Sequence, residues 1–322
     1  MKRNDAEPKL KYVLDCGGVA VSSHHLHTIG AECICNVELF ELQKVNYQRI
    51  YGADKPVWME DIMKVTLPGM NRFFDSLDKP VQHVKVGEID FWIATTSCVE
   101  ISMVNKRRTM YAVPNLTLID LPRRIREFQP KIVIVENSNN LFKANMLPLF
   151  DSLVWELEHL EGYYYQYAEL DAVHYNVPQH RKRGYIIMTR ADYGEPAWPT
   201  ATSTDYASLC LNAVFPDITA FTSGLYRNEP VPANRPCCTI TAGGLVRVYE
   251  NGVVEPRPLT VEEGKVLMTV GKDFNLDGLS LKEAFLLLGN GVPANLMLEI
   301  VRTLKEQVLS RGSSALNKGL AA

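Results

Sequence analysis

The stretch Asp90-Phe-Trp-Ile-Ala-Thr-Thr-Ser-Cys-Val-Glu-Ile-Ser102 determines how the rest of the chain is interpreted. Residues 91–94 form an apolar run typical of a buried strand, and the small polar residues after them lead to Cys98. In an open α/β sheet, ligands bind beyond the carboxyl ends of the strands. Cys98 is therefore placed for chemistry. The alternative is that it is a small buried hydrophobic residue, as most free cysteines are.

Two other segments show the same pattern of an apolar strand that ends on an acidic residue. Residues 132–135 form a continuous apolar run before Glu136, which is typical of a strand buried on both faces of a parallel sheet. Residues 32–37 predict a strand that ends at Glu38. These patterns predict the α/β class, with a mostly parallel, Rossmann-like sheet and a small second domain.

A glycine turn comes before the strand that ends at Glu38. Residues 11–15 predict a first strand, and Cys16-Gly-Gly-Val-Ala-Val-Ser-Ser23 follows it as a turn into a helix that Gly30 ends. Glu38 stands 21 residues after Gly17. This is close to the separation of about 20 at which nucleotide-binding sheets place the acid that binds ribose hydroxyls. The full G-x-G-x-x-G pattern is absent, so the unit indicates a nucleotide-like ligand without identifying it.

The composition excludes several classes of protein. With 322 residues, 46% of them hydrophobic and 22% charged, the chain is typical of a globular protein with one large domain and a smaller one. It has no run of about 18 apolar residues, and its start lacks the apolar core of a secretory signal. Seven cysteines, an odd number without metal-binding spacing, indicate reduced thiols inside a cell. We therefore expect a cytoplasmic or nucleoid-associated protein without a membrane span or a metal, and we interpret His24, His25 and His27 as exposed helix residues.

The charge pattern leaves nucleic acid open as a partner. The net charge is −3, which argues against a protein that is basic all over, but a local basic surface is enough for nucleic acid. Two clusters are candidates: Lys106-Arg107-Arg108, with the arginines of residues 123–126, and His180-Arg181-Lys182-Arg183. The alternative for each cluster is an ordinary solvated charged face.

The remaining elements are expected from apolar periodicity and capping signals. Thr260, with Glu263 three residues on, is a capping-box signal for the start of a helix. The composition shifts to Pro, Thr, Ser, Gly and Asp over residues 191–234, which indicates a small, partly irregular region. The other predicted elements are an irregular excursion over 63–87, a strand over 235–241 and helices over 259–268, 281–288 and 294–308.

Several short stretches agree in order and spacing with one family, the cytosine-C5 methyltransferases. Thr96-Ser-Cys-Val-Glu-Ile-Ser102 resembles the family's Pro-Cys-Gln motif, and Val135-Glu-Asn-Ser138 resembles its Glu-Asn-Val motif. Gln179-His-Arg-Lys-Arg183 is similar to the Gln-x-Arg-x-Arg motif. Arg235-Pro-Cys-Cys-Thr-Ile240 and Gly289-Asn-Gly-Val-Pro293 resemble the last two motifs. The resemblance covers about residues 11–190 and 234–308.

The resemblance implies the fold, the reaction and the site. The fold would be that of S-adenosylmethionine-dependent methyltransferases, and the reaction would be methyl transfer to C5 of cytosine in DNA through a covalent Cys98 adduct. The implied catalytic residues are Cys98, Glu136, Arg181 and Arg183. The implied S-adenosylmethionine-binding residues are Asp15, Cys16, Gly17, Gly18, Glu38, Leu39, Asp61, Ile62, Thr95, Asn290 and Val292. The implied nucleic-acid-binding residues are Lys106, Arg107, Arg108 and Gln179.

The resemblance also implies how the chain is divided. Residues 1–190 would form the catalytic and cofactor-binding domain, and residues 191–280 would form a small target-recognition region. Residues 281–311 would return to the first domain as C-terminal helices, and residues 312–322 would be a disordered tail. We expect DNA as the partner, a monomeric enzyme, and low sequence specificity because the recognition region is short.

Departures from the family pattern keep alternatives open. The glycine turn is one residue shorter than usual, Ser97 replaces the proline before the nucleophile, Val99 replaces glutamine, and Ser138 replaces valine. One alternative is a C5 transferase that acts on cytosine in RNA or uses an altered cofactor. The other is a catalytically degenerate paralogue that binds nucleic acid or a partner. The altered glycine turn favours the degenerate paralogue, whereas the presence of Cys98, Glu136, Arg181 and Arg183 together favours an active DNA methyltransferase.

Overall fold

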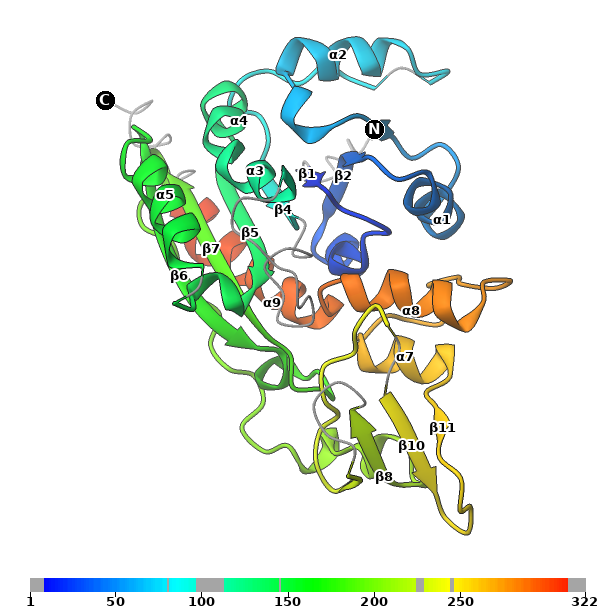
Figure 1. Ribbon diagram of the computed structural model, residues 1–322. Coiled ribbons are helices and arrows are strands. Elements are labelled where there is room, and N and C mark those ends of the chain that lie inside the picture. The colour runs from blue at the N-terminus through cyan, green and yellow to red at the C-terminus, as the bar shows by residue number, and fades with distance from the viewer. Residues whose placement is uncertain are drawn as a thin grey trace, which may run out of the picture.

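The computed structural model describes residues 9–79, 81–96, 113–144, 146–223, 229–243 and 246–311. Its centre is a seven-stranded sheet with strand order β3-β2-β1-β4-β5-β7-β6 (Figure 1). The strands are β1 Leu10–Asp15, β2 Ala31–Glu38, β3 Val57–Met59, β4 Phe91–Ala94, β5 Ile132–Ser138, β6 Tyr163–Asp171 and β7 Lys182–Arg190. All neighbours pair in parallel except β7, which is antiparallel to both β5 and β6. The predicted mostly parallel α/β sheet is thus confirmed.

Helices cover both faces of this sheet. Successive residues of one strand, such as Trp92 and Ile93 of β4, are both buried and belong to cores on opposite faces. One face packs against α2 Leu67–Asp75, α3 Val113–Ile119, α4 Leu121–Phe128 and α5 Leu147–Glu158. The other face packs against α1 Glu41–Tyr51 and α9 Ala294–Leu304. This double burial explains why the strands are continuous apolar runs rather than alternating ones.

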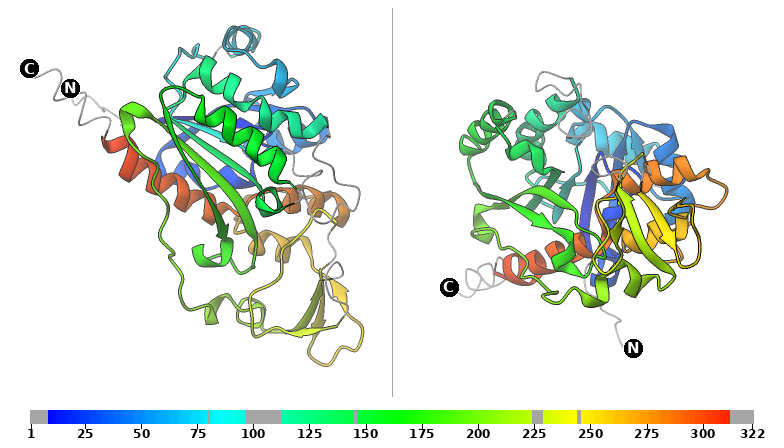
Figure 2. Two further views of the ribbon diagram at one scale, coloured as in Figure 1. Left: turned by 60° about the vertical axis from the view of Figure 1, so that its left-hand side comes forward. Right: turned by 60° about the horizontal axis from the view of Figure 1, so that its bottom comes forward.

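A smaller four-stranded antiparallel sheet lies at the bottom of Figure 1, with strand order β11-β10-β8-β9. Its strands are β8 Ile218–Ser223, β9 Val231–Pro232, β10 Val246–Glu250 and β11 Arg257–Pro258. Its core includes residues of α6 Leu211–Val214, α7 Val261–Leu267 and α8 Leu281–Asn290, together with Val19 and Val21 of the glycine turn. A long strap after β7 leads from the large sheet to this region (Figure 2). The small region is therefore packed directly on the turn that follows β1.

Several local predictions are confirmed, and others are wrong. The capping box of Thr260 and Glu263 is present at the start of α7, and Gly30 adopts the expected left-handed conformation with φ 78°. The helix predicted before Gly30 is instead two short 3₁₀ turns, η1 Val21–Ser23 and η2 Leu26–Ile29. The region 63–87 is not wholly irregular, because it contains α2. Residues 235–241 make only an isolated bridge, between Cys237 and Gln179. The remaining short elements are η3 Ile62–Lys64, η4 Asn139–Phe142, η5 Ala172–Tyr175, η6 Ala191–Tyr193, η7 Ala207–Leu209 and η8 Lys305–Leu309.

Among the histidines near the glycine turn, His27 is exposed as expected, whereas His24 differs from expectation. His24 is buried, its Nε2 lies 3.4 Å from an oxygen of Asp273, and its ring packs edge-on against Phe274. Burial lowers the pKa of His24, an effect that Asp273 opposes. His24 therefore anchors the 3₁₀ turns to the segment before α8 instead of facing solvent.

Residues Leu281–Leu309 contain a helical segment that is long and apolar enough to cross a membrane, and 72% of its most apolar window is buried inside the protein. The turn at Gly291 and Pro293 divides this segment into α8 and α9. Leu296, Ile300 and Leu304 of α9 pack on the large sheet. We therefore interpret the segment as core helices.

Candidate cofactor and catalytic site

A cavity of about 390 Å³ lies at the carboxyl ends of β1, β2, β4 and β5. The end of α8 closes one side of it with Asn290, Gly291 and Val292. The predicted cofactor residues that line it are Cys16, Gly17, Gly18, Glu38, Leu39, Asp61, Ile62, Thr95, Asn290 and Val292. The only one of the predicted cofactor residues that does not line it is Asp15. Segments that lie far apart in the sequence therefore meet at one sheet edge, as the strand-end argument predicts.

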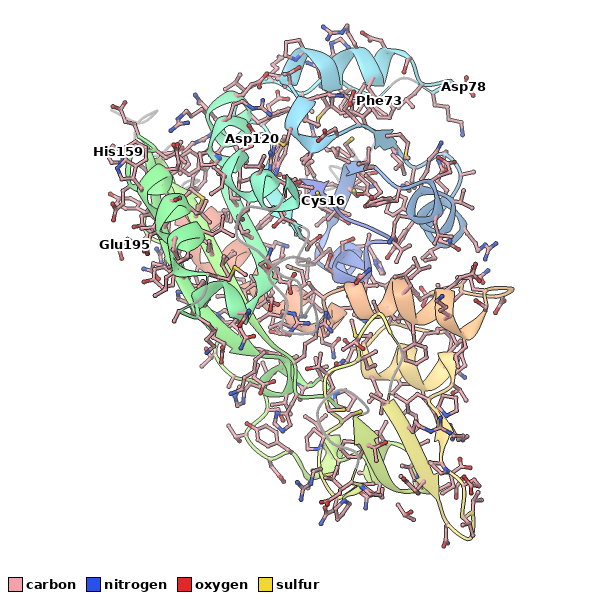
Figure 3. The ribbon with its side chains drawn as sticks, in the orientation of Figure 1. Cys16, Phe73, Asp78, Asp120, His159 and Glu195 are labelled. Carbon is pink, nitrogen blue, oxygen red and sulfur yellow. The ribbon has the colours of Figure 1, made fainter. Side chains whose placement is uncertain are left out.

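The glycine turn wraps the cavity tightly despite its short length. Figure 3 labels Cys16, where the turn begins at the end of β1. Cys16, Gly18 and Ala20 have φ values of 55°, 56° and 57°, so every second residue is in the left-handed region. A Cβ at Gly17 would come within 2.5 Å of Asn36 Oδ1, so no larger residue fits there without movement. The backbone of the turn thus approaches the cavity because its residues pack closely on β2.

Glu38 shapes the same turn from the end of β2. Its Oε2 accepts a hydrogen bond from Gly18 N at 2.9 Å, and its Oε1 accepts from Leu39 N at 2.8 Å and Phe40 N at 3.0 Å. Burial raises the pKa of Glu38, and these three N–H donors oppose the shift. The carboxylate thus holds the turn and faces the cavity at the same time.

Asp15 has a structural role instead of the predicted cofactor contact. Its side chain is fully buried, and Oδ2 accepts hydrogen bonds from Trp92 Nε1 at 3.1 Å and from Arg124 Nη2 at 3.0 Å. Arg124 is also fully buried and donates to Asp120 and to the carbonyl of Thr117. A carboxylate held by a buried arginine points into the protein, so the prediction that Asp15 binds the cofactor is wrong for its side chain.

Glu136 lies on the wall of the cavity, at the end of β5. Its carboxylate is buried, with Oε1 3.3 Å from Arg183 Nε. Burial raises the pKa of Glu136, and the charges of Arg183 and Arg181 oppose the shift. The next residue, Asn137, donates from Nδ2 to Thr96 Oγ1 at 3.1 Å. The end of β4, from which the chain continues towards Cys98, is therefore tied to the strand that carries Glu136.

Arg181 supports the site through hydrogen bonds to backbone carbonyl groups. It is 2% exposed and donates to Ile240 O at 2.8 Å, Gly289 O at 3.0 Å and Gly291 O at 2.7 Å. Gly289 allows this convergence because a Cβ there would lie 2.2 Å from the backbone carbon of Thr241. Of the two roles expected for Arg181, support of the site or contact with a phosphate, these bonds agree with support, because the side chain holds the end of α8.

Gln179 is likewise internal, which corrects its prediction as a nucleic-acid-binding residue. It is fully buried, its Nε2 donates to Leu267 O at 2.6 Å, and its Oε1 accepts from Ile240 N at 3.0 Å. Both the nitrogen and the oxygen of the amide are hydrogen-bonded to the small region, so the buried Gln179 side chain is not exposed to DNA. Of the basic cluster around it, His180 and Lys182 are the exposed members, with side chains 51% and 59% exposed.

Four predicted site residues lie outside the described residues: Cys98, Lys106, Arg107 and Arg108. Conversely, the cavity is lined by residues that sequence reasoning missed. Phe40 could have been predicted from the sequence, because it is a large apolar residue two positions after the acid that ends β2, at the edge of the sheet where ligands bind. In the structure Phe40 lines the cavity and is 65% exposed. No sequence pattern marked Gln43 of α1 or Thr117 of α3 as cavity residues, because helix packing alone brings them to the cavity.

The arrangement suits a ligand with a polar sugar and an apolar ring. Polar groups of Glu38, Asp61 and Asn290 alternate with the apolar Leu39 and Ile62 around one cavity. Cavities of about 300–1,000 Å³ hold small-molecule ligands and cofactors. Within the described residues, no three His, Cys, Asp or Glu side chains are grouped to hold a metal ion.

Comparison with known proteins agrees with this geometry. The model of the family "C-5 cytosine-specific DNA methylase" matches residues 16–220. Over 268 residues, the chain is 26% identical to the type II methyltransferase M.HgiDI of Herpetosiphon aurantiacus, which covers 74% of this chain and 84% of that protein. It is 24% identical over 170 residues to the type II methyltransferase M.HhaI of Haemophilus parahaemolyticus, covering 52% of this chain and 45% of the relative. The Entamoeba histolytica methyltransferase EhMeth shares the fold, with a TM-score of 0.66 at 14% identity over 93% of this chain and 99% of that one.

Proposed function

Because the chain belongs to the family of C-5 cytosine-specific DNA methylases, we propose that it transfers a methyl group from S-adenosylmethionine to C5 of cytosine in DNA. The observation that carries the proposal is that one cavity contains both the glycine turn with Glu38 and the carboxylate of Glu136. A cofactor bound at the turn and a base beside Glu136 would therefore meet in that cavity. A DNA substrate also implies an intracellular protein.

The residues present fit S-adenosylmethionine. Glu38 would bind the ribose, Asp61 and Ile62 would lie at the adenine, and Asn290 and Val292 would close the site from α8. The exposed apolar side chains of Leu39 and Phe40, 56% and 65% exposed, would cover the adenine ring. When bound, this cofactor supplies an electrophilic methyl group.

Cytosine C5 is a poor nucleophile, so the protein must first activate the ring. The Cys98 thiolate would form a bond to C6, and the ring electrons would shift so that C5 becomes the nucleophilic carbon of an enamine. The negative charge that would develop at N3 is met by a proton from Glu136, whose pKa is raised by burial. After C5 has been methylated, loss of the C5 proton expels Cys98 and restores the aromatic ring.

We propose that Arg183 assists this step. Its Nε is 3.3 Å from Glu136 Oε1, and Nη1 donates to Lys182 O at 2.8 Å. We assign Arg183 to hold O2 of the base beside Glu136. A base inside a duplex cannot reach this position, so it must be flipped out at a cost of a few kcal/mol. The segment with Lys106, Arg107 and Arg108 is proposed to bind the phosphates that flank the flipped nucleotide.

The alternatives differ in substrate or in activity. An enzyme acting on RNA would use the same cavity and the same carboxylate. A degenerate paralogue would have no reason to keep Glu136 buried beside Arg183, because burying a carboxyl group and its charged partner costs free energy without a function. The intact pair therefore favours an active enzyme, and the short recognition region favours DNA read with little sequence information.

Replacement of Glu38 tests the cofactor site. We expect Glu38→Gln to weaken S-adenosylhomocysteine binding about tenfold or more, because one carboxylate oxygen that accepts backbone N–H bonds becomes an amide donor. Isothermal titration calorimetry measures the effect, and Glu32→Gln, on the same strand but at its other end, is the matched control. Unchanged affinity in the Glu38 variant would contradict the assignment.

Low sequence specificity is the second expectation. Residues 191–234 contain a single arginine, Arg227, and arginine to guanine is the commonest specific base contact. In the small sheet, Arg257 forms ion pairs with Glu250 and Glu263 at 2.5 and 2.7 Å, so it would have to break them to contact a base. Each bidentate base contact supplies only about 1–3 kcal/mol of discrimination. We therefore expect methylation in many contexts, with a preference set by one or two neighbouring bases.

Bisulfite sequencing of a plasmid treated with protein and S-adenosylmethionine measures this specificity and also tests the proposed function. Protected cytosines should appear only when the cofactor is present, spread over many sequence contexts, and DNA binding should weaken steeply with salt. A single fixed site of four or more base pairs would contradict low specificity. No protected cytosines at all would contradict DNA methylation.

A further inference from the structure

The side chain of Gln43 lines the proposed cofactor cavity. Its Oε1 is buried with no partner among the residues that the structure describes. A buried amide oxygen without a partner costs free energy, so such an atom commonly marks a place where a ligand or water completes the hydrogen bonds. A ligand bound in the cavity would supply the missing partner of Gln43 Oε1.

The position of Gln43 on its helix explains why the amide is free. It is the third residue of α1, whose N-cap is Phe40. A glutamine at this position commonly reaches back to the N–H of the N-cap residue. Here Phe40 N already donates to Glu38 Oε1 at 3.0 Å. The amide of Gln43 is therefore not needed to cap α1.

Gln43 and Glu38 flank the same residue of the glycine turn. Gly18 N donates to Glu38 Oε2 at 2.9 Å, and a Cβ placed on Gly18 would lie 3.5 Å from Gln43 Oε1. A group that binds the turn beside Gly18 therefore meets a carboxylate from β2 and an amide from α1. These two side chains differ in chemistry, since the carboxylate only accepts hydrogen bonds, whereas the amide both donates and accepts.

The hydroxyls of a ribose match this pair. One of the two ribose hydroxyls can donate its proton to Glu38, and the other can donate its proton to Gln43 Oε1. Glu38 already accepts three backbone N–H bonds, so it has little capacity left to bind two hydroxyls alone. We propose that Gln43 is a further cofactor-specificity residue, which binds a ribose hydroxyl beside Glu38 and so distinguishes a ribosyl from a deoxyribosyl ligand. This inference rests on the proposed S-adenosylmethionine site.

Calorimetric titration of variants with hydroxyl-deleted ligands tests the inference. The ligands are S-adenosylhomocysteine and its 2′-deoxy and 3′-deoxy analogues. The variants are Gln43→Met and, as control, Gln48→Met on the same helix, where Gln48 is bonded to Ala53 O. We expect Gln43→Met to bind S-adenosylhomocysteine roughly 3- to 12-fold more weakly, the net value of one hydrogen bond. The same substitution should have little effect on the affinity for one of the two deoxy analogues, and Gln48→Met should match the wild type throughout.

The outcomes separate this inference from the function on which it rests. Equal weakening for all three ligands, or no weakening for any, would overturn the role of Gln43 while leaving the cofactor site intact. Failure of the wild type to bind S-adenosylhomocysteine would overturn both. Thermal unfolding of Gln43→Met with the midpoint of the wild type shows that any change in binding is not a change in folding.

Discussion

Cys98→Ser is expected to abolish covalent capture of the protein on DNA that contains 5-fluorocytosine. Fluorine at C5 cannot leave as a proton does, so the wild-type adduct cannot be resolved and should persist through denaturing electrophoresis. A serine hydroxyl is hardly ionised near neutral pH and is a harder nucleophile, so it should not add to C6. The capture reaction needs the protein, the modified DNA and S-adenosylmethionine.

Cys210→Ser is the matched control, because Cys210 is a half-buried cysteine of the small region whose Sγ lies 3.3 Å from Tyr206 O. It should be captured as the wild type is. Capture that persists in Cys98→Ser would contradict the assignment of the nucleophile. Loss of capture in both variants would show that the assay reports folding instead of chemistry.

Glu136→Gln should lower turnover by about 10²–10⁴-fold, the usual contribution of a positioned acid or base. Glutamine can donate a hydrogen bond to N3 but cannot transfer a proton, so the loss should fall on kcat while the Kd for DNA changes little. Glu169→Gln, at an exposed position of β6 where the carboxylate accepts a hydrogen bond from Asn139 Nδ2, is the control. Equal losses in DNA binding and turnover would point to a structural role for Glu136.

The raised pKa of Glu136 also makes the stability of the folded protein depend on pH in a defined direction. Burial makes the folded protein hold this proton more tightly than the unfolded chain does. The stabilising contribution is therefore present at low pH and is lost as pH rises from the unfolded pKa through the folded one. Glu136→Gln, which is neutral at every pH, should be at least as stable as the wild type at pH 8. Thermal unfolding at pH 5 and pH 8 measures this alongside turnover.

Much of the cavity could be predicted because it is built from strand ends. Glu38, Thr95 and Glu136 stand at or just beyond the carboxyl ends of apolar runs, and parallel pairing brings such ends to one edge. The predicted contacts of Asn290 and Val292 depended on the family motif rather than on any strand pattern. Their place is explained by Gly291, where a Cβ would lie 2.5 Å from Val21 Cβ and hold α8 away from the glycine turn.

The residues that were assigned wrongly share one physical cause. Gln179 stands in a cluster with the composition of a DNA-binding surface, but its partners are backbone groups 61 and 88 residues away in the chain. Asp15 ends a strand as a ligand-binding acid does, yet its partner Arg124 lies 109 residues away. Local patterns show which groups are polar, whereas tertiary packing decides whether a polar group faces a ligand or the backbone. The helix α2 is different, since its N-cap Thr66 and the proline in its first turn were signals present in the sequence.

The central claim, methyl transfer to cytosine in DNA, is tested most directly by mass spectrometry of nucleosides. The protein is incubated with S-adenosylmethionine carrying a deuterated methyl group and with DNA or RNA in parallel, and the nucleic acid is then digested. We expect labelled 5-methyl-2′-deoxycytidine from DNA, and none from the Cys98→Ser protein. Label that appears only as 5-methylcytidine from RNA, or in neither nucleic acid, would contradict it.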